Sequence, residues 1–186
     1  MNKKIIAVVY ILFFMNLSGN AWAGNVNFFL GQKTLDKDDW EPVDKQPEFG
    51  VLVDFKQQSW PVSIALDFLG SKDETTIAGI NVEGNTAELD FGVRKIWDTE
   101  NSTIRPYIGG GVAFIRAEVK GTLSPFTVSV DDSGAGLWIG GGIYWTLNQS
   151  FNLGLDLRYS QADVTLAGTD VKAGGTHAGI LLGYHW

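Results

Sequence analysis

The stretch FNLGLDLRYS, residues 151–160, alternates at every position between an apolar side chain and a small, polar or charged one. An α-helix completes a turn in about 3.6 residues, so this spacing would scatter the apolar side chains around its axis. In a β-strand, successive side chains point to opposite faces, and alternation gives one apolar face and one polar face. Residues 151–160 therefore predict a two-faced strand.

Seven other segments alternate in a similar way. They span residues 26–31, 48–55, 62–68, 87–94, 104–114, 136–145 and 177–186. The connections between them alternate in length: residues 56–61, 98–103 and 147–150 are short, whereas residues 35–46, 70–84, 117–134 and 162–173 are long and mostly polar. This layout predicts an all-β fold: an eight-stranded antiparallel up-and-down transmembrane β-barrel with short periplasmic turns and long extracellular loops. Alternation within residues 127–130 indicates that strands extend beyond the membrane.

The composition excludes several classes of protein. The 186 residues include no cysteine, which removes thiolate catalysis, zinc ribbons and a disulfide framework. The formal net charge is −7, and an acidic chain does not suit nucleic acid, so we expect no nucleic-acid partner. Glycine is abundant, at 23 residues, as expected where strands curve tightly or approach one another closely.

The N-terminus has the features of a secretory signal. Lys3 and Lys4 precede the apolar run of residues 5–15, which is too short for a membrane-spanning helix, and Ala21-Trp22-Ala23 has the small-x-small pattern of a cleavage site. We expect residues 1–23 to be a signal peptide and residues 24–186 to form one barrel domain in a bacterial outer membrane. The alternative is an uncleaved anchor.

The chemistry of the two strand faces indicates which one points outward. The apolar face carries more large rings than the lumen of an eight-stranded barrel can hold, whereas the other face carries glycines, small residues and charges. We therefore expect the apolar face to contact lipid; the alternative is a soluble periplasmic barrel. Six aromatic residues near the short turns or the C-terminus are predicted to form an interfacial girdle: Phe55, Trp60, Trp97, Trp145, Phe151 and Trp186.

The polar face collects charges of both signs. These are Lys33, Glu48, Asp54, Asp67, Glu88, Asp90, Arg94, Arg105, Asp156 and Arg158. Each would be costly to bury alone, so we expect them to pair across the lumen as a network that fills the barrel. The functional alternative is an ion path or a binding site.

The last strand carries a sequence-level resemblance. Ile180, Leu182, Tyr184 and Trp186 alternate up to an aromatic terminal residue, and this segment resembles the C-terminal strand of bacterial outer-membrane proteins. That resemblance implies recognition by the barrel-assembly machinery, through pairing of an exposed strand edge. In those proteins the last residue is most often phenylalanine, and Trp186 is a variant.

The whole barrel region resembles the small opacity-protein and OmpA-type eight-stranded barrels. Besides the last strand, the glycine triplets at 109–111 and 140–142 and the segment 157–160 are similar to these proteins. The resemblance implies a non-enzymatic role in envelope integrity or adhesion. Lipid and lipopolysaccharide would surround the barrel, and a surface partner would bind through the loops. The alternatives are a lipid A-modifying enzyme and a narrow pore for small solutes.

Candidate sites for chemistry are few. His177 lacks the serine two positions on that small-barrel deacylases use, although it could meet Ser160 or Asp156 across neighbouring strands. Acidic residues gather in the first long loop, but no segment has the spacing of a calcium loop, so we expect solvated carboxylates and neither metal nor cofactor. Trp40 and Phe126 are candidate exposed contacts for a partner.

Overall fold

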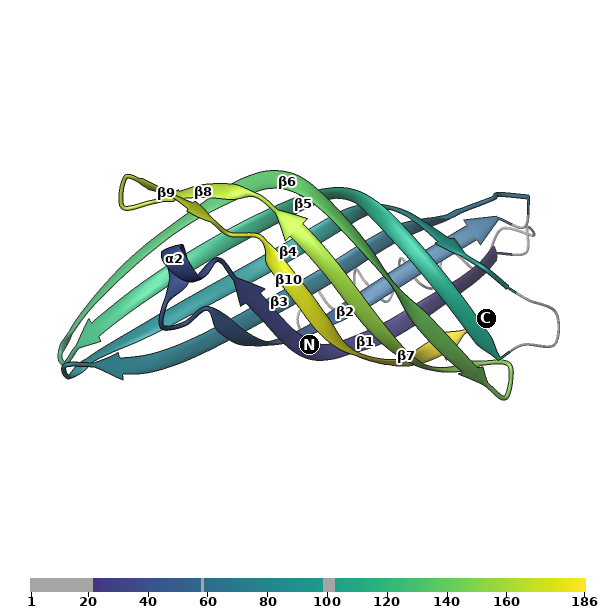
Figure 1. The fold of residues 1–186 in the computed structure, drawn as a ribbon, viewed down its shortest axis with the longest axis horizontal. Coiled ribbons are helices and arrows are strands. Elements are labelled where there is room, and N and C mark those ends of the chain that lie inside the picture. Colours follow the sequence, from purple (N-terminus) through teal and green to yellow (C-terminus); the bar gives the residue numbers. More distant parts are fainter. Residues whose placement is uncertain (1–21, 58, 99–102) are drawn as a thin grey trace, which may run out of the picture.

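The computed structural model describes residues 22–57, 59–98 and 103–186. Eight long strands form a closed antiparallel barrel (Figure 1). They are β1 (Trp22–Leu35), β2 (Lys45–Gln57), β3 (Ser63–Ile77), β4 (Ile80–Ile96), β5 (Ile104–Leu123), β6 (Phe126–Leu147), β7 (Phe151–Gln161) and β10 (Gly175–His185). Each pairs with its neighbours in the order of the chain, and β1 pairs with β10 to close the ring. The predicted eight-stranded up-and-down barrel is confirmed.

The ring closes next to the two ends of the barrel domain. The backbone N–H of Gly24 donates to the carbonyl of Trp186 at 3.0 Å, and the N–H of Trp186 donates to the carbonyl of Gly24 at 3.1 Å. Trp22 and Ala23, assigned to the signal peptide by the sequence, belong to β1 and pair with Gln57 and Lys56. The rest of the predicted signal peptide lies outside the described residues.

The apolar face of the strands points outward. Along β7, Leu153, Leu155 and Leu157 are exposed, whereas Asp156 and Arg158 between and after them are buried in the lumen. The same alternation holds around the barrel, so the outer surface is hydrocarbon and the interior is polar. Within the described residues, no helix has both the length and the apolar character to cross a membrane.

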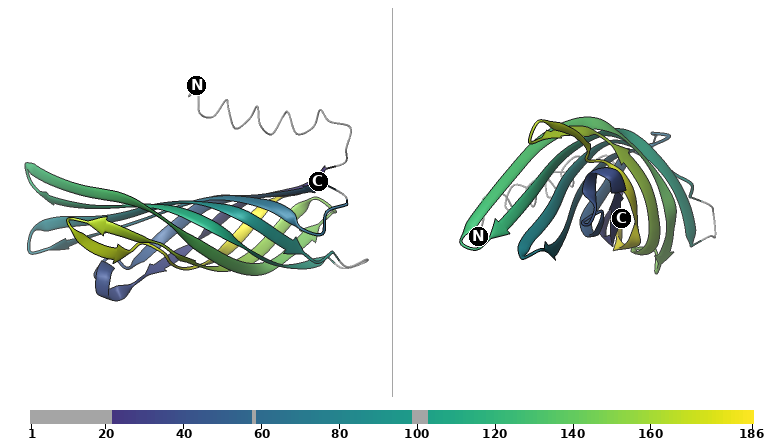
Figure 2. Two further views of the ribbon diagram at one scale, coloured as in Figure 1. Left: turned by 90° about the horizontal axis from the view of Figure 1, so that it is seen from above. Right: turned by 60° about the vertical axis from the view of Figure 1, so that its left-hand side comes forward.

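Four strands extend far beyond the others at the long-loop end of the barrel. β3, β4, β5 and β6 continue as one sheet past the point where β2 and β7 stop pairing with them (Figures 1 and 2). The alternation in residues 127–130 indicated strands that extend beyond the membrane, and β6 confirms this extension. The sequence nevertheless assigned residues 70–84 and 117–134 to long loops. They are instead tight hairpins, whose strands meet at the pairs Ile77↔Ile80 and Leu123↔Phe126. The first turn consists of Ala78 and Gly79, both with positive φ, as a two-residue hairpin turn requires.

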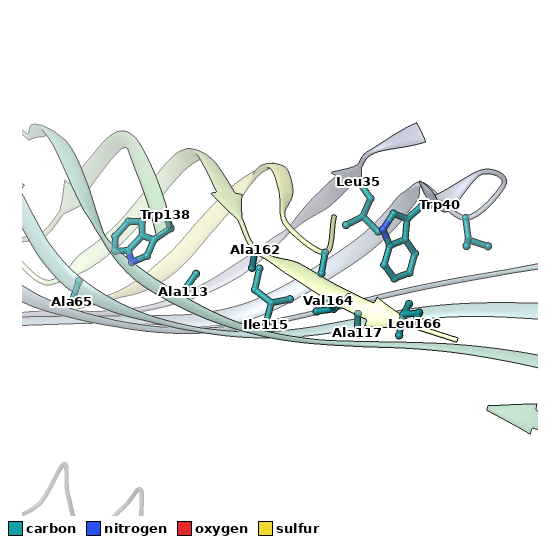
Figure 3. Close-up of a cluster of buried hydrophobic side chains, with 12 residues drawn as sticks. Leu35, Trp40, Ala65, Ala113, Ile115, Ala117, Trp138, Ala162, Val164 and Leu166 are labelled. Carbon is teal, nitrogen blue, oxygen red and sulfur yellow. The ribbon is translucent and has the colours of Figure 1, made fainter. Parts of the chain in front are cut away.

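The remaining two long loops fold over the lumen. Residues 36–44 contain α2 (Lys37–Trp40), and residues 162–173 form the small hairpin of β8 (Asp163–Leu166) and β9 (Thr169–Lys172). Their apolar side chains pack on the inner face of β5 and β6 and form a cluster that we call the mouth cluster (Figure 3). It comprises Leu35, Trp40, Val43, Ala65, Ala113, Ile115, Ala117, Trp138, Ala162, Val164, Leu166 and Ala173.

Trp40 does not have the exposed position that the sequence suggested. Its side chain is only 3% exposed, because the first loop folds inward and places the indole in the mouth cluster. Its Nε1 donates to the carbonyl of Lys172 at 2.8 Å, which links the first long loop to the last. Phe126, by contrast, is 75% exposed at the tip of the β5–β6 hairpin.

Candidate functional site

Two arginines lie in the centre of the lumen and share one carboxylate. Arg94 on β4 and Arg158 on β7 both donate to Oδ2 of Asp67 on β3, at 2.7 Å and 3.0 Å. All three side chains are almost completely buried. Asp67 therefore joins opposite walls of the barrel through two charge-assisted hydrogen bonds, which are stronger than neutral ones.

Further carboxylates and rings surround this centre. Arg94 also pairs with Asp54 at 3.2 Å, and Arg158 pairs with Asp90 at 3.2 Å and Asp156 at 2.8 Å. The guanidinium groups also lie over aromatic rings, Arg94 at 5.3 Å from the centroid of Tyr107 and Arg158 at 5.5 Å from that of Trp138. At this level ion pairs and rings fill the lumen.

A second polar layer lies on the extracellular side of this centre, beside the mouth cluster. Lys33 Nζ donates to Glu88 Oε2 at 2.9 Å, and the ring of His177 lies 2.9 Å from Glu48 through Nδ1. The other ring nitrogen of His177 lies 3.0 Å from Ser160 Oγ. Ser160, His177 and Glu48 thus stand in the order of a hydroxyl, a base and an orienting carboxylate, as in serine hydrolases.

The surroundings of this trio do not favour catalysis. Ser160 and His177 are both 0% exposed, beneath the mouth cluster. Ser160 Oγ also lies 3.2 Å from Glu88 Oε2. An oxyanion needs hydrogen-bond donors around it, and a carboxylate at this distance would oppose its formation. The meeting of His177 with Ser160, anticipated from the sequence, is therefore present as a buried polar contact.

A third layer closes the short-turn end. Arg105 Nε donates to Asp98 Oδ1 at 2.6 Å, and its Nη1 lies 3.2 Å from Thr146 Oγ1 and 3.3 Å from Asn25 Oδ1. Asn25 in turn donates to Asp54 at 2.7 Å, which connects this layer to the central arginines. The polar network thus runs along most of the barrel axis.

All ten charged residues singled out in the sequence for the lumen are buried there. The structure adds inward-facing partners that the sequence analysis did not name, chiefly Tyr107, Tyr144, Trp138 and Asn25. Strand parity was the signal that could have found them. Asn25 shares its inward phase with Lys33 and Tyr107 with Arg105, and Trp138 and Tyr144 alternate with the outward apolar residues of β6. Their large side chains on an otherwise small and ionic face concealed them.

The aromatic residues assigned to the girdle lie on the outer surface of the short-turn end. Trp60, Trp97, Phe151 and Trp186 are between 38% and 48% exposed, and Phe55 and Trp145 are partly buried. The alternate residues of the last strand, Ile180, Leu182, Tyr184 and Trp186, also point outward and are exposed. These positions do not test the two roles assigned from the sequence. Anchoring at the membrane interface and recognition by the barrel-assembly machinery stay predictions.

The extended part of the sheet reverses the polarity of the barrel wall. We call β3 from Lys72, β4 up to Asn85, β5 from Arg116 and β6 up to Ser133 the protruding sheet. On its outer face, in phase with the lipid-facing residues, lie Lys72, Glu74, Glu83, Arg116, Glu118, Lys120 and Asp131. On its inner face, in phase with the lumen charges, lie Ile77, Ile80, Val82, Val119, Leu123, Phe126, Val128 and Val130. The reversal begins at Lys72 and Arg116 and marks where the outer wall leaves hydrocarbon.

The acidic first loop is held by one basic residue. Lys172 Nζ lies 2.7 Å from Asp36 Oδ2, and its backbone N–H donates to Asp39 at 2.9 Å. The hydrogen bond from Lys172 lowers the pKa of Asp36 below its usual value of 3.8. Among the described residues, no group of three or more His, Asp or Glu side chains is arranged to hold a metal ion.

Comparison with known proteins decides the family. A model of the outer membrane protein β-barrel domain matches residues 5–186. The chain belongs to this family. It is an eight-stranded β-barrel of the bacterial outer membrane, so the protruding sheet and the two inward-folded loops lie at the extracellular end. No curated protein sequence matches this barrel significantly.

Solved structures share the barrel's fold at low sequence identity. Neisserial surface protein A is 13% identical with a TM-score of 0.54, covering 90% of this chain and 97% of its own. OprG of Pseudomonas aeruginosa is 14% identical with a TM-score of 0.56, covering 90% and 97%. Ail, the attachment invasion locus protein of Yersinia pestis, in complex with the heparin analogue sucrose octasulfate, is 13% identical with a TM-score of 0.56, covering 89% and 97%.

Proposed function

We propose that this outer-membrane barrel is a non-enzymatic surface-interaction protein that binds extended polypeptides along the protruding sheet. The observation that carries the proposal is the free edge of β6. Pairing between β6 and β7 begins only at Leu137↔Gln161, and among the described strands none pairs with the outer edge of β6 between Phe126 and Asp131. An unpaired edge presents backbone N–H and C=O groups that can accept a further strand.

The side chains of this edge suit such an addition. Residues 126–130 read FTVSV, a run of β-branched and aromatic residues without charge. Phe126 and Val128 are 75% and 70% exposed on the inner face of the sheet. A partner strand with apolar residues at alternate positions would cover both while its backbone pairs with β6. The net charge of −7 argues for a polypeptide over a polyanion of the kind bound by Ail.

The lumen supports the role of a rigid stem. Eight strands leave room inside a barrel for little besides side chains, and the Asp67-centred ion pairs occupy that room. We expect no discrete conductance steps when the purified barrel is added to a planar lipid bilayer. Steps that disappear with an Asp67 substitution would instead favour the pore alternative.

The proposal of a non-enzymatic role has its own test. Ser160 and His177 are the pair that would carry a lipid A deacylase activity, and both are enclosed. Cells carrying the wild type, Ser160→Ala or His177→Ala are expected to show the same lipid A acylation profile. If the wild-type barrel changes lipid A acylation relative to cells that lack the barrel, and neither variant does, the enzyme alternative is established.

Two predictions from the sequence belong to the same proposal. The outward-facing rings at the short-turn end would anchor the barrel at the periplasmic interface. The outward-facing residues of β10 would be read by the barrel-assembly machinery before closure, because the edge of β10 is free until β1 pairs with it. Lipopolysaccharide would surround the extracellular half.

The experiment for the main proposal uses the full barrel in nanodiscs and a fluorescent peptide with the sequence of residues 126–131. Binding is followed by fluorescence anisotropy. Val128→Lys places a charge on the apolar face of the free edge and is expected to abolish binding. Thr127→Lys adds the same charge on the opposite, polar face of the same edge and serves as the matched control. Absence of binding to wild type, or equal loss in both variants, would refute the proposed surface.

A further inference from the structure

The outer surface of the barrel is hollowed just below the protruding sheet. A row of paired residues, Gly70 on β3 and Ala87 on β4, has almost no side chain. The next row toward the membrane centre contains Phe68, Leu89 and Phe114, whose side chains are large. The change in side-chain size between the two rows produces depressions in the outer wall. They lie at the level where the wall passes from the hydrocarbon core of the membrane to its polar surface.

The side chain of Phe68 divides two apolar grooves. On one side is a groove of about 580 Å³, bounded by Phe28, Phe49 and Phe68 with Gly70 on its floor. On the other side is a groove of about 500 Å³ between Phe68 and Phe114, with Ala87 on its floor. Both are open to the surroundings of the barrel and are lined chiefly by carbon, as acyl-chain sites are.

A third pocket, of about 310 Å³, has a mainly apolar lining and a charged rim, and it joins the upper ends of these grooves. Gly70 and Ala87 line it, and Lys72, Asn85 and Arg116 surround its extracellular side. Two cations and an amide group thus face a small space directly above two apolar channels. This combination matches a lipid whose head carries phosphate.

The charges around the pocket permit a phosphate there. Lys72 pairs with Glu83 at 2.7 Å and Arg116 with Asp131 at 2.9 Å, but both cations have more than half of their side chains exposed. An exposed ammonium or guanidinium group has further N–H donors besides the one that meets its carboxylate, so each cation can also donate to a phosphate. Glu118, the acidic residue of the pocket, is neutralised by Lys120 at 3.0 Å.

We propose that this surface binds one phosphorylated, multiply acylated lipid of the outer leaflet. Its phosphate lies between Lys72 and Arg116, and its acyl chains lie in the grooves on the two sides of Phe68. The site is on the convex outer wall and does not involve the free edge of β6, so it is independent of the proposed polypeptide surface.

The test places the full barrel in phosphatidylcholine nanodiscs containing a small share of purified lipid A. Native mass spectrometry counts the lipid A molecules that remain on the released barrel. The double variant K72Q/R116Q is expected to reduce lipid A retention about tenfold, because it removes the charge-assisted hydrogen bonds to the phosphate. K37Q/K45Q removes two exposed cations from the other side of the mouth and is expected to retain lipid A as the wild type does.

A second pair of variants tests the grooves. Ala87→Leu fills the floor beside Phe68 and is expected to lower retention, whereas Ala178→Leu adds the same side chain on the outer face of β10 and is not. Heat-modifiable gel mobility verifies that each variant is folded. Equal retention by K72Q/R116Q and wild type, or equal retention of lipid A stripped of its phosphates, would overturn the proposal.

Discussion

Asp67 and Arg94 lie 2.7 Å apart in the middle of the lumen, with neither side chain exposed to solvent. The same carboxylate oxygen of Asp67 also meets Arg158, at 3.0 Å. Arg158 approaches it from the opposite wall of the barrel, and the two guanidinium groups also meet Asp54, Asp90 and Asp156. The centre therefore holds more carboxylates than guanidinium groups, and both arginines are needed to balance them.

We expect Arg158→Gln to be the most destabilising single change among the lumen charges, because it leaves the buried Asp90 and Asp156 without their guanidinium partner. Asp67→Asn is expected to cost less, because both arginines keep other carboxylates. Breaking a buried pair costs about 3–5 kcal/mol, because the remaining charge is left uncompensated. Urea titration of the barrel in lipid vesicles, followed by gel mobility, measures the loss. Glu74→Gln, which removes an exposed partner 3.9 Å from Lys72, is the control and is expected to cost less than about 1 kcal/mol.

The mouth cluster is expected to be separable from the barrel. Trp40→Ala removes one of its two indole rings and the hydrogen bond to Lys172, at a cost of about 3–5 kcal/mol that falls on the two inward-folded loops. Hydrogen exchange in residues 36–44 and 162–173 should accelerate while exchange in the barrel strands stays slow. Equal acceleration in β1 and β7 would show that the loops and the barrel unfold as one unit.

The ion pair between Lys72 and Glu83 gives the protruding sheet a defined acid response. The hydrogen bond from Lys72 lowers the pKa of Glu83 from 4.5 to about 2. A depressed folded-state pKa adds stability that is complete above the unfolded value and is lost as the pH falls toward about 2. Carbon-detected NMR should show Glu83 still ionised at pH 4, and Lys72→Gln should return its titration toward the ordinary range. A midpoint that does not move in Lys72→Gln would contradict this assignment.

Close contact between β4 and β5 requires glycine at position 111. A Cβ added there would lie 2.1 Å from the carbonyl oxygen of Phe91, so the two backbones would have to separate. We expect Gly111→Val to prevent assembly or to cost at least about 1–3 kcal/mol. Gly121 has nothing within 4 Å of the added atom, and Gly121→Val is the matched substitution. Comparable folding yields for the two variants would argue against a backbone contact that excludes side chains.

The membrane-embedded part of the fold was predictable because one rule governs it. Lipid outside and ions inside produce strict alternation, and residues 151–160 display it without exception. The same alternation predicted that the ten charged side chains point into the lumen. What parity cannot specify is which charges meet: Asp67 contacts Arg94 and Arg158 only because the ring brings β3, β4 and β7 around one axis.

The extracellular part was less predictable because the rule reverses there. Alternation continues through residues 126–130, but the apolar residues now face inward and the polar ones outward. Polar composition made residues 70–84 and 117–134 resemble loops, although they are strands. The inward fold of Trp40 depends on the β8–β9 hairpin, more than a hundred residues away in the chain, and no local pattern indicates that contact.

The double hydrogen bond between Gly24 and Trp186 sets an order of events for biogenesis. The first strand of the cylinder gains its second neighbour only when β10 reaches it, so the ring cannot close before that segment is in place. A variant lacking residues 183–186 would leave the backbone groups of residues 24–27 without these partners, and an open seam of this kind favours misassembly.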